Sequence, residues 1–328
     1  MYFPFPVYIE GAELKIFIVG DLKPYNLEYF YRKALVELGN EVYFYDQLNG
    51  LKLEPLLRMS MSRVSSMRPL LNKLQVNKDL ACVVNNISPD IVIIFKGHLL
   101  TTNTLTEINR SHKSVLIYPD SDRFPILLRE RVGLFNSVFT QDNEKETFIK
   151  LGAKRVFTLP FACDPDFHKS LHLPKRYNLS FVGTFYLERY KVLKKIGGVD
   201  IFGKYWILRA GKHHRPIFGQ EYIHVINESI VNLNIHNCSD IRNDGQNMRT
   251  FEVAGCGGLL FCEEMPSLHK YFSHNEVETY QDVVDLKSKL ISLQENPDEI
   301  VYRGFQAQER CYREHTYKHR ARQLLDQA

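Results

Sequence analysis

Two acidic side chains eight positions apart stand out in the stretch NDGQNMRTFEVAGCGG, residues 243–258. They are Asp244 and Glu252, and Asn247 and Arg249 lie between them. A helix that begins behind a polar loop presents free backbone N–H groups and the positive end of its dipole. A phosphate or another anion suits such a position, so the stretch is a candidate anion-binding site.

Local signals predict the elements that hold these residues. Asn247 is a predicted N-cap, residues 248–254 fit a short helix, and the glycines behind them favour its end. The apolar run at 259–262 then predicts a buried strand. The alternative is structural: Glu252 would be a solvated helix residue and Asp244 a turn former.

A second acidic pair follows another apolar run. Asp120 and Asp122 form a D-x-D pattern in PDSDRF, residues 119–124, which could hold a divalent cation and a diphosphate. A polar turn after a strand is the alternative interpretation. His213 and His214 are adjacent and cannot both face one site on a regular element, and His236 with Cys238 lacks further ligands nearby in the sequence. We therefore expect no zinc centre.

Gly183 and Thr184 end the run NLSFVGT and lead into a predicted helix that carries Arg189 and several lysines. A strand, a small-residue turn and a helix with basic side chains form an arrangement that receives phosphate. Many α/β proteins use the same turn only for close packing. Both interpretations stay open on these residues alone.

Size and charge restrict the class of protein. A chain of 328 residues with 44% hydrophobic content predicts two domains, each with its own core. The 42 basic and 38 acidic residues give a net charge of +4, which does not argue for nucleic acid as a partner. A weakly anionic partner, such as a phosphate or a lipid surface, remains compatible with this balance.

Targeting and redox signals favour a cytoplasmic protein. The opening MYFPFPVYI is too short and too rich in proline for a signal peptide or a membrane span. The six cysteines contain no CxxC pair, which predicts reduced core residues.

Short β-rich runs alternate with helical patterns, which predicts parallel sheets covered by helices. In the first half, strands are expected at 15–20, 41–46, 90–95, 114–120, 137–142 and 155–160, with helix over most of 51–88. The segment 160–178 has no period and contains many Pro, Asp and His residues, so we place the linker between two domains there.

The second half repeats the alternation. Strands are expected at 178–183, 199–203, 216–219, 230–236, 258–262 and 277–280, and helices near 187–196, 220–228, 247–255, 282–294 and 297–326. The fold class is therefore α/β, with two Rossmann-like domains. In such domains ligands bind beyond the carboxyl ends of the strands, and two facing domains form a cleft.

The second half resembles a known family. LSFVGTFYLER, PIFGQEYIHVINESIVNLNIH, NDGQNMRTFEVAGCGGLLFCEE and the terminal segment from ENPDEI to RQLL are similar, in this order, to the group 1 glycosyltransferases of the CgeB-like branch, named for a spore maturation protein. PDIVIIFKGHLL and the segment from VFTQDNE to CDPDFH in the first half resemble that family more weakly.

The resemblance implies a hexosyltransferase with the GT-B fold, a nucleotide-diphosphate sugar as donor and retention of anomeric configuration. It implies an acceptor-side domain at 1–170, a nucleotide-sugar domain at 171–312 and a helix at 313–328 that crosses back to the first domain. No metal and no cofactor besides the donor substrate are expected.

The resemblance also implies roles for single residues. Glu252 would address the ribose of the nucleotide, and Asp244, one methylene shorter than the glutamate typical of the family, would address the transferred sugar. The donor-site residues implied in this way are Gly183, Thr184, Arg189, Phe218, Gly219, Asn247, Met248, Arg249 and Glu252. Of these, Gly183, Thr184 and Arg189 would bind the diphosphate and Phe218 with Gly219 would lie against the base.

In the first domain, five residues at predicted strand ends would face the acceptor: Gly20, Lys96, His98, Asp120 and Asp122. His98 joins Asp244 and Glu252 as a catalytic candidate, and a structural role is the alternative for each of the five. The acceptor would be a glycan, a lipid-linked molecule or a protein, and peripheral membrane association is compatible with the second of these.

Two further hypotheses stay open. One is a metal-dependent glycosyltransferase centred on Asp120 and Asp122, which a chelator would inactivate. The other is a non-catalytic protein that binds a nucleotide sugar, suggested by aspartate at the first acidic position.

Overall fold

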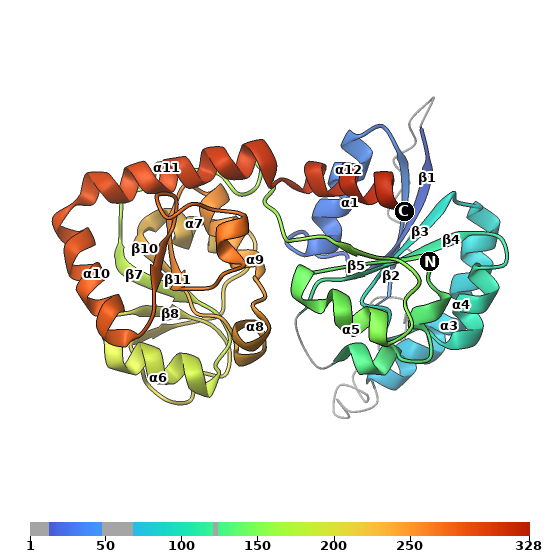
Figure 1. Ribbon diagram of the computed structural model, residues 1–328, viewed down its shortest axis with the longest axis horizontal. Helices are drawn as coiled ribbons and strands as arrows, with labels where there is room; N and C mark the ends of the chain where they lie inside the picture. Colours follow the sequence, from blue (N-terminus) through green and yellow to red (C-terminus); the bar gives the residue numbers. More distant parts are fainter. Residues whose placement is uncertain (1–12, 48–67, 121–123) are drawn as a thin grey trace, which may run out of the picture. The chain divides into compact units, whose positions relative to one another are not determined.

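A computed structural model describes residues 13–47, 68–120 and 124–328, and these form two compact units (Figure 1). The first unit runs to Leu159 and also contains Ala321–Ala328 at the end of the chain, whereas the second comprises Pro160–Arg320. Each unit is an α/β domain built on a parallel sheet, as the alternating sequence pattern predicts. The end of the chain returns to the first unit, as the GT-B expectation requires.

The first unit contains a six-stranded sheet in the order β2-β1-β3-β4-β5-β6. Its strands are β1 (Lys15–Gly20), β2 (Glu41–Asp46), β3 (Ile91–Phe95), β4 (Lys113–Tyr118), β5 (Ser137–Thr140) and β6 (Val156–Thr158). Its helices are α1 (Leu27–Glu37), α3 (Arg68–Ile87), α4 (Thr102–Ile108), α5 (Lys145–Lys150) and three 3-10 turns at Phe124–Leu128, Val132–Leu134 and Asp142–Glu144. Strands such as β3 are buried along their whole length, because helices cover both faces of a parallel sheet.

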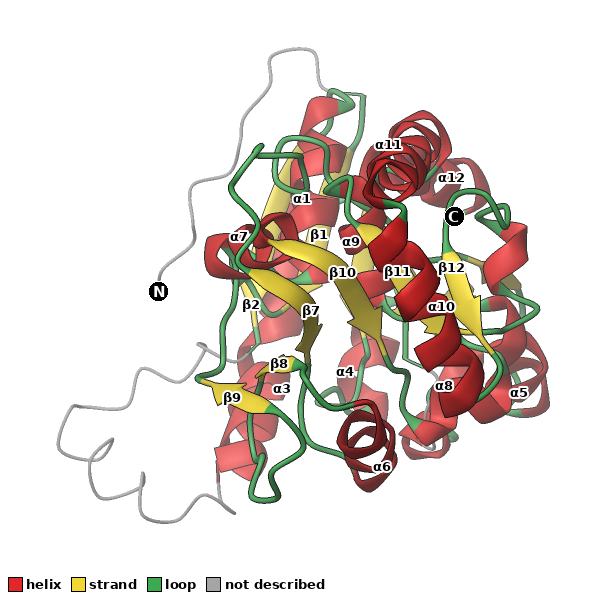
Figure 2. Ribbon diagram, turned by 90° about the vertical axis from the view of Figure 1, so that its left-hand side faces the viewer, coloured by secondary structure: helices red, strands yellow, loops and turns green. Residues whose placement is uncertain are grey.

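The second unit also contains a six-stranded sheet, in the order β12-β11-β10-β7-β8-β9. Its strands are β7 (Tyr177–Val182), β8 (Asp200–Phe202), β9 (Lys212–His214), β10 (Ser229–Asn234), β11 (Leu259–Glu263) and β12 (Glu278–Tyr280). Its helices are α6 (Leu187–Ile196), α7 (Gln220–Glu228), α8 (Cys238–Asn243), α9 (Met248–Gly255), α10 (Val283–Glu295) and α11 (Pro297–Glu314), with a 3-10 turn at Leu268–Lys270, and α12 (Tyr317–Gln327) follows α11. Figure 2 shows helices on both sides of this sheet.

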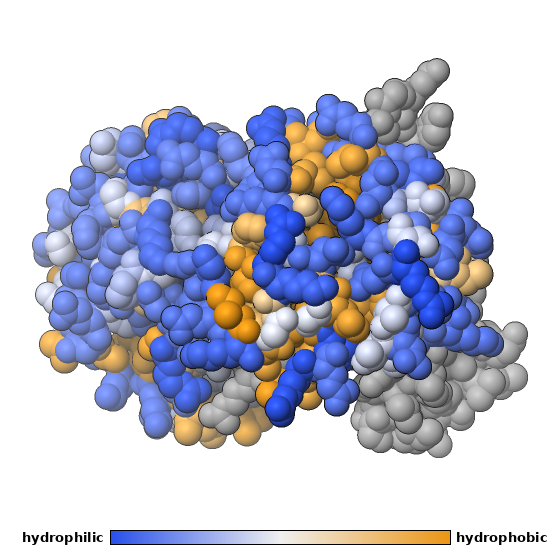
Figure 3. Space-filling view, turned by 45° about the vertical axis from the view of Figure 1, so that its right-hand side comes forward, coloured by the Kyte–Doolittle hydropathy of each residue, from blue (hydrophilic) through white to orange (hydrophobic). Residues whose placement is uncertain are grey.

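The sheet of the second unit has a core of aliphatic and aromatic side chains. Phe181, Leu233 and Phe261 from neighbouring strands pack against Leu193 of α6 and Leu286 of α10. The face drawn in Figure 3 is mainly hydrophilic, with separate apolar patches. Burial of the strands therefore follows their apolar runs, and the polar residues of the chain lie mostly at the surface.

One expected strand, at 216–219, is wrong. The edge strand is β9 at Lys212–His214, and the chain leaves the sheet before Pro216. Proline has no N–H for a ladder, and Gly219 adopts a positive φ of 59° as the N-cap of α7. The segment that looked like a strand is therefore the turn that begins α7.

The C-terminal segment forms two helices instead of the single helix expected at 297–326. The break falls at His315 and Thr316, where Thr316 pairs with Cys163 in an isolated bridge. The Thr316 hydroxyl accepts a hydrogen bond from the N–H of His319 at 3.3 Å, so Thr316 caps α12. Tertiary pairing with the Cys163 segment ends α11 at this point.

Three other expectations need adjustment. Helix was expected over most of 51–88, and the described part of it is α3, because residues 48–67 lie outside the described residues. Cys82 is exposed, so the expectation that all cysteines are core residues is wrong for it.

The boundary between the units falls at Leu159 and Pro160. The following segment packs on α9 and α11, where the Tyr312 hydroxyl donates to the His168 carbonyl at 2.9 Å.

Leu324 provides a test of how the C-terminal segment docks. The side chain is 0% exposed, and nearby Gln323 donates a hydrogen bond to the Thr158 carbonyl of β6 at 2.8 Å. Leu324→Ala is expected to lower the free energy of unfolding by about 2–5 kcal/mol, because it leaves a cavity in a packed core. Urea unfolding followed by circular dichroism measures the change. Val301→Ala on the exposed side of α11 is the control, and an equal loss in both variants would contradict the docking.

Candidate functional site

The carboxyl ends of β7 and β10 are neighbours in the second sheet, at the point where the strand order reverses direction. Such a switch point is where open α/β sheets bind ligands. Gly183 follows β7 there, and its N–H already donates to the Phe202 carbonyl at 2.8 Å. A Cβ at Gly183 would lie 2.8 Å from the Phe181 ring, so glycine is required for the close turn. Gly183 shapes this edge of the sheet, and its own amide is already used.

Arg189 spans the switch point from the first turn of α6. Its Nε donates to the Ile235 carbonyl at 2.9 Å and its Nη1 to the Thr184 carbonyl at 3.0 Å. The side chain is 4% exposed and its guanidinium lies 4.9 Å from the centre of the Tyr186 ring. Burial, and then the charge of Arg249, lower its pKa to about 9. A buried cation of this kind is stabilised by an anion.

Arg249 and Asn247 begin α9 and hold it to the end of β10. Arg249 Nε and Asn247 Nδ2 both donate to Asn234 Oδ1, at 3.1 and 2.9 Å. Within the described residues, neither Arg249 nor Arg189 forms an ion pair with a carboxylate. Two guanidinium groups that repel each other thus lie at one edge of the sheet, beside the N-terminus of a helix. This edge favours a ligand with more than one negative charge.

Two buried polar atoms at the same edge lack partners. His236 follows β10, and its Nδ1 lies 2.9 Å from Glu263 Oε2. The opposite nitrogen, Nε2, and Asn247 Oδ1 are buried and without a hydrogen bond among the described residues. A buried polar atom without a partner lowers stability, so a polar ligand at this edge would be expected to satisfy such atoms.

Glu252 lies one turn further along α9 and is 7% exposed, so its interpretation as a solvated helix residue is wrong. Burial raises its pKa to about 7, although Arg249 and the Tyr222 hydroxyl act to lower it. His168 Nδ1 accepts a hydrogen bond from the Asp164 N–H at 2.9 Å, so the His168 proton is on Nε2, which lies 3.7 Å from Glu252 Oε1. The Glu252 carboxyl group is therefore buried, close to the Tyr222 hydroxyl and the His168 imidazole.

Asp244 has a different environment. It ends α8 in the left-handed conformation, with φ 53° and ψ 42°, and its Oδ1 accepts a hydrogen bond from the Ser267 N–H at 3.0 Å. Asp and Asn tolerate this conformation better than other residues with a side chain. Asp244 therefore shapes the turn that leads to α9, and its Oδ2 makes no hydrogen bond within the described part of the chain.

Phe218 and Gly219 lie just before α7. Phe218 is 47% exposed, and Lys204 Nζ lies 5.1 Å from the centre of its ring. Tyr222, on the first turn of α7, is the residue beside Glu252. The first turn of α7 therefore joins the Phe218 side chain to the environment of Glu252, and an exposed ring there can lie against a planar ligand.

The candidate residues of the first unit also gather at one edge of its sheet. Gly20 is the last residue of β1, and Lys96 and Asp120 come after the neighbouring strands β3 and β4. Lys96 Nζ lies 2.5 Å from Asp120 Oδ2. His98 follows Lys96, and its ring meets Tyr118 edge to face at 5.5 Å between centres. Asp122 lies outside the described residues, so the D-x-D pair stays a prediction.

The sequence analysis did not assign four side chains to these edges, one in the first unit and three in the second. In the first unit, Glu28 lies beside Gly20, and burial raises its pKa, which Lys96 opposes. In the second unit, the residues are His168, Tyr222 and His236. His236 directly follows the apolar run of β10, and that position at a strand end is the signal that could have found it. His168 and Tyr222 carry no such signal, because only tertiary packing brings them to Glu252.

A comparison with protein families matches residues 184–326 to the model described as glycosyl transferase-like. The match contains Arg189 and the whole stretch from Asp244 to Glu252. This segment of the chain is therefore similar to glycosyl transferase-like proteins. No curated protein matches the sequence.

Solved structures match nearly the whole chain. Sucrose-phosphate synthase from Thermosynechococcus elongatus gives a TM-score of 0.64 at 10% identity and covers 95% of this chain and 98% of its own. HepE from Anabaena, solved in complex with UDP-glucose, gives a TM-score of 0.62 at 10% identity and covers 96% of this chain and 99% of its own. Trehalose-6-phosphate synthase OtsA gives a TM-score of 0.64 at 11% identity and covers 95% of this chain and 98% of its own. At these identities the likeness establishes the fold, which is GT-B. The comparisons do not bear on the CgeB-like branch, which stays a prediction.

Among the described residues, no helix has the length and apolar character needed to cross a bilayer.

Proposed function

We propose that this chain, which has the GT-B fold and is similar to glycosyl transferase-like proteins at residues 184–326, moves a sugar from a nucleotide-diphosphate sugar to an acceptor. The observation that carries the proposal is the pair Arg189 and Arg249, two neighbouring guanidinium groups without a carboxylate partner in the described residues. They lie at the switch point of the second sheet, beside the N-terminus of α9. A diphosphate supplies the charge that this arrangement lacks.

The donor is proposed to lie along the carboxyl edge of the second sheet. Arg249 and the N–H groups of Met248 and Arg249 bind the diphosphate, and Arg189 with the turn at Gly183 and Thr184 forms the wall behind it. Glu252 accepts hydrogen bonds from the ribose hydroxyls. A carboxylate suits vicinal hydroxyls because it accepts two hydrogen bonds at once.

The rest of the donor is assigned to the two ends of this edge. The base lies against Phe218 and Gly219, whose helix carries Tyr222 beside Glu252. The transferred sugar lies toward Asp244, whose Oδ2 is available to accept a hydrogen bond. HepE was solved with UDP-glucose, so UDP-glucose is the first donor to test.

The reaction breaks the bond between the anomeric carbon and the phosphate oxygen, and the electron pair stays on the leaving diphosphate. The acceptor oxygen forms the new bond to that carbon, and its proton passes to the leaving phosphate, which accounts for retention of configuration. Positive charge at Arg249 and at the start of α9 stabilises the leaving group, so no metal is required for this step.

The acceptor is proposed to be a glycan, a lipid-linked molecule or a protein, and Gly20, Lys96, His98 and Asp120 of the first unit are its candidate contacts. Tyr205 and Ile207 are 74% and 84% exposed and lie next to Lys204. An exposed apolar segment beside basic residues suits the surface of an anionic membrane. Cosedimentation with anionic vesicles tests peripheral association, and a protein that stays in the supernatant would argue against it.

Arg249→Gln provides the test of the proposed function. The variant is expected to bind UDP or UDP-glucose roughly 10- to 150-fold more weakly, because a charge-assisted hydrogen bond to the diphosphate is lost. Calorimetry measures this, after a thermal-shift screen over UDP, GDP, dTDP and CMP sugars has identified the donor. The matched control is Arg215→Gln, because Arg215 is exposed and pairs with Glu221.

An assay of donor hydrolysis and sugar transfer, run with the donors of that screen, decides between the alternative functions. We expect donor hydrolysis or transfer to persist in EDTA. Complete loss in EDTA, with a recovery on addition of Mn²⁺ that Asp120→Asn abolishes, would favour the metal-dependent alternative at Asp120 and Asp122. Tight binding without any turnover would favour the non-catalytic alternative. If Arg249→Gln binds every nucleotide as the unchanged protein does, the assignment of the diphosphate site is wrong.

A further inference from the structure

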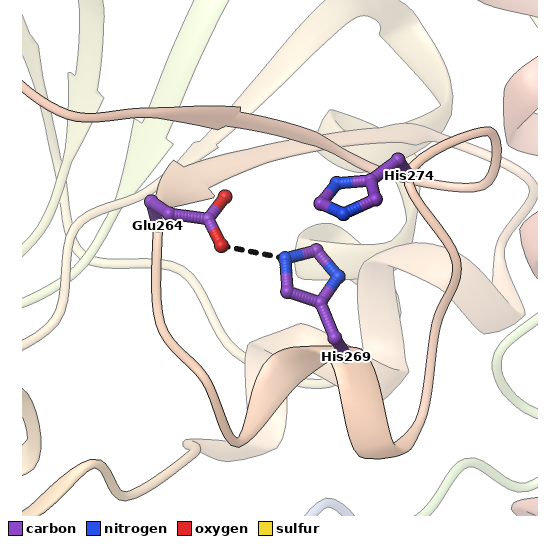
Figure 4. Close-up of side chains that lie close together, drawn as sticks. All are labelled: Glu264, His269 and His274. Atoms are coloured by element: carbon purple, nitrogen blue, oxygen red, sulfur yellow. Dashed lines mark hydrogen bonds and ion pairs between the residues drawn. The ribbon is translucent and has the colours of Figure 1, made fainter.

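Three side chains with metal-binding atoms meet after β11, in the loop that leads to β12 (Figure 4). Glu264 directly follows β11, His269 lies in the 3-10 turn Leu268–Lys270, and His274 lies further along the same loop. One ligand atom from each lies within 4.8 Å of the other two. The spacing E-x4-H-x4-H is visible in the sequence, although residues at that spacing converge only when the loop folds back on itself.

The geometry of His269 sets which of its nitrogens faces the cluster. Its Nδ1 lies 3.3 Å from the Phe272 carbonyl, which can only accept, so Nδ1 carries a proton. Its Nε2 lies 2.6 Å from Glu264 Oε1, another acceptor. A cation between these two atoms, either a proton or a metal, removes the repulsion between their lone pairs. A carbonyl that fixes the far nitrogen is also the usual outer partner of a metal-bound histidine.

His274 completes the cluster. The His269 and His274 rings approach to 3.9 Å between centres, at 42° to each other. Glu264 is anchored by its N–H, which donates to the Tyr280 carbonyl of β12 at 2.9 Å.

We propose that Glu264, His269 and His274 bind one divalent transition-metal ion of the zinc type. Two imidazole nitrogens and one carboxylate oxygen form a ligand set that zinc accepts, and water would fill the fourth position. Mg²⁺ and Ca²⁺ prefer sites made of oxygen atoms and are poor occupants of this one.

Such an ion would restrict the loop between β11 and β12, which contacts Asp244. Ser267 lies between two of the ligands, and its N–H donates to Asp244 Oδ1 at 3.0 Å. Its hydroxyl accepts a hydrogen bond from Gln246 Nε2 at 2.7 Å. A metal that joins the two ends of the loop would restrict Ser267 and, through it, Asp244. The ion has a positioning role here, and the site does not depend on the proposed transfer reaction.

Zinc binding to the full chain tests the proposal directly. The protein is reduced, freed of any affinity tag and stripped with a chelator, and then titrated with Zn²⁺ by calorimetry and with Co²⁺ by visible absorption. We expect one ion per chain and a rise in melting temperature. Since loss of outer-shell partners alone weakens metal binding about 10- to 100-fold, His269→Ala and His274→Ala are expected to weaken it at least about 100-fold. Glu264→Gln should weaken it as well, and Mg²⁺ should not compete.

The chain offers a matched control. His214 Nε2 lies 2.6 Å from Asp200 Oδ1, the same distance as in the proposed site, but this pair is not part of a group of three ligands in the described residues. His214→Ala and Cys82→Ser, which removes an exposed thiol, should bind zinc like the unchanged protein. Absence of saturable zinc binding would overturn the proposal, and so would binding that survives in both His269→Ala and His274→Ala. Either result would leave the test with Arg249→Gln unaffected.

Discussion

Glu252→Gln is expected to weaken binding of the nucleoside diphosphate and of the donor alike, by roughly 10- to 150-fold. The reason is that the proposed ribose contact loses a charge-assisted hydrogen bond worth about 1.5–3 kcal/mol. The same substitution is expected to stabilise the free protein at pH 8, because glutamine does not place a charge in this buried position. Higher stability together with weaker nucleotide binding in this variant would identify Glu252 as a binding residue that lowers the stability of the free protein.

The stability effect follows from the pKa of Glu252. Burial raises this pKa from its ordinary value of 4.5 to about 7. The folded protein therefore holds the proton more tightly than the unfolded chain, so the free energy of unfolding falls as the pH rises from about 4.5 to about 7. The full difference corresponds to roughly 3 kcal/mol. Urea unfolding of the unchanged protein and of Glu252→Gln at pH 4.5 and pH 8 measures this difference. The unfolding curves of the two proteins should diverge only at pH 8.

Binding should show the opposite dependence on pH. Ribose hydroxyls donate to the ionised carboxylate, so affinity for the diphosphate should rise as the pH approaches 7, by up to roughly tenfold per pH unit. Glu252→Gln should lose this dependence. Glu221→Gln, on the exposed side of α7, is the control and should retain it. Equal affinity in Glu252→Gln and the unchanged protein across this range would remove Glu252 from the site.

Asp244→Asn is expected to leave diphosphate binding nearly intact while turnover falls, by roughly 10- to 150-fold if a charge-assisted hydrogen bond to the sugar is lost. Asparagine is the appropriate replacement because it tolerates the left-handed conformation at φ 53° and can accept the hydrogen bond from Ser267. A change in which sugar is accepted would also support the assignment. Steady-state kinetics with the donor, beside calorimetry with the diphosphate alone, separates the two effects.

Two comparisons make this experiment specific. Asp282→Asn, at the exposed N-cap of α10, keeps its capping role and should not change turnover. Asp244→Ala would strain the backbone and loosen the Ser267 loop, so its loss of activity would not distinguish the sugar contact from the turn. If Asp244→Asn turns over the donor at the rate of the unchanged protein, Asp244 is only the residue that ends α8.

The sequence alone determined the elements and the fold class. Apolar runs such as Ile91–Phe95 predict buried strands because a parallel sheet is covered on both faces, and alternation with amphipathic helices predicts two doubly wound domains. The short helix behind Asn247 was predicted at the position of α9, because helix and glycine signals are local. The Asn247 side chain makes no capping hydrogen bond and donates to Asn234 Oδ1 instead. The same reasoning failed at 216–219, where Pro216, Ile217 and Phe218 precede Gly219 in a turn and not in a strand.

Only the tertiary structure decided the environments of the side chains. Glu252 could be read from the sequence as a solvated residue, yet Tyr222 of α7 and His168 of the segment after Pro160 surround it. Arg189 and Arg249 are far apart in the sequence, and the pairing of β7 with β10 brings their helices to one edge. Burial and charge depend on contacts between distant segments, so local patterns cannot set them.

The same distinction applies to the loop after β11. The sequence shows Glu264, His269 and His274 at equal intervals, a spacing that on a regular helix would not place all three on one side. The structure brings their ligand atoms together because the chain turns between β11 and β12 and returns beside Glu264. Local propensities are sums over neighbouring residues and therefore determine strands, helices and caps. A site is made by the packing of those elements, and its chemistry is fixed only once the chain has folded.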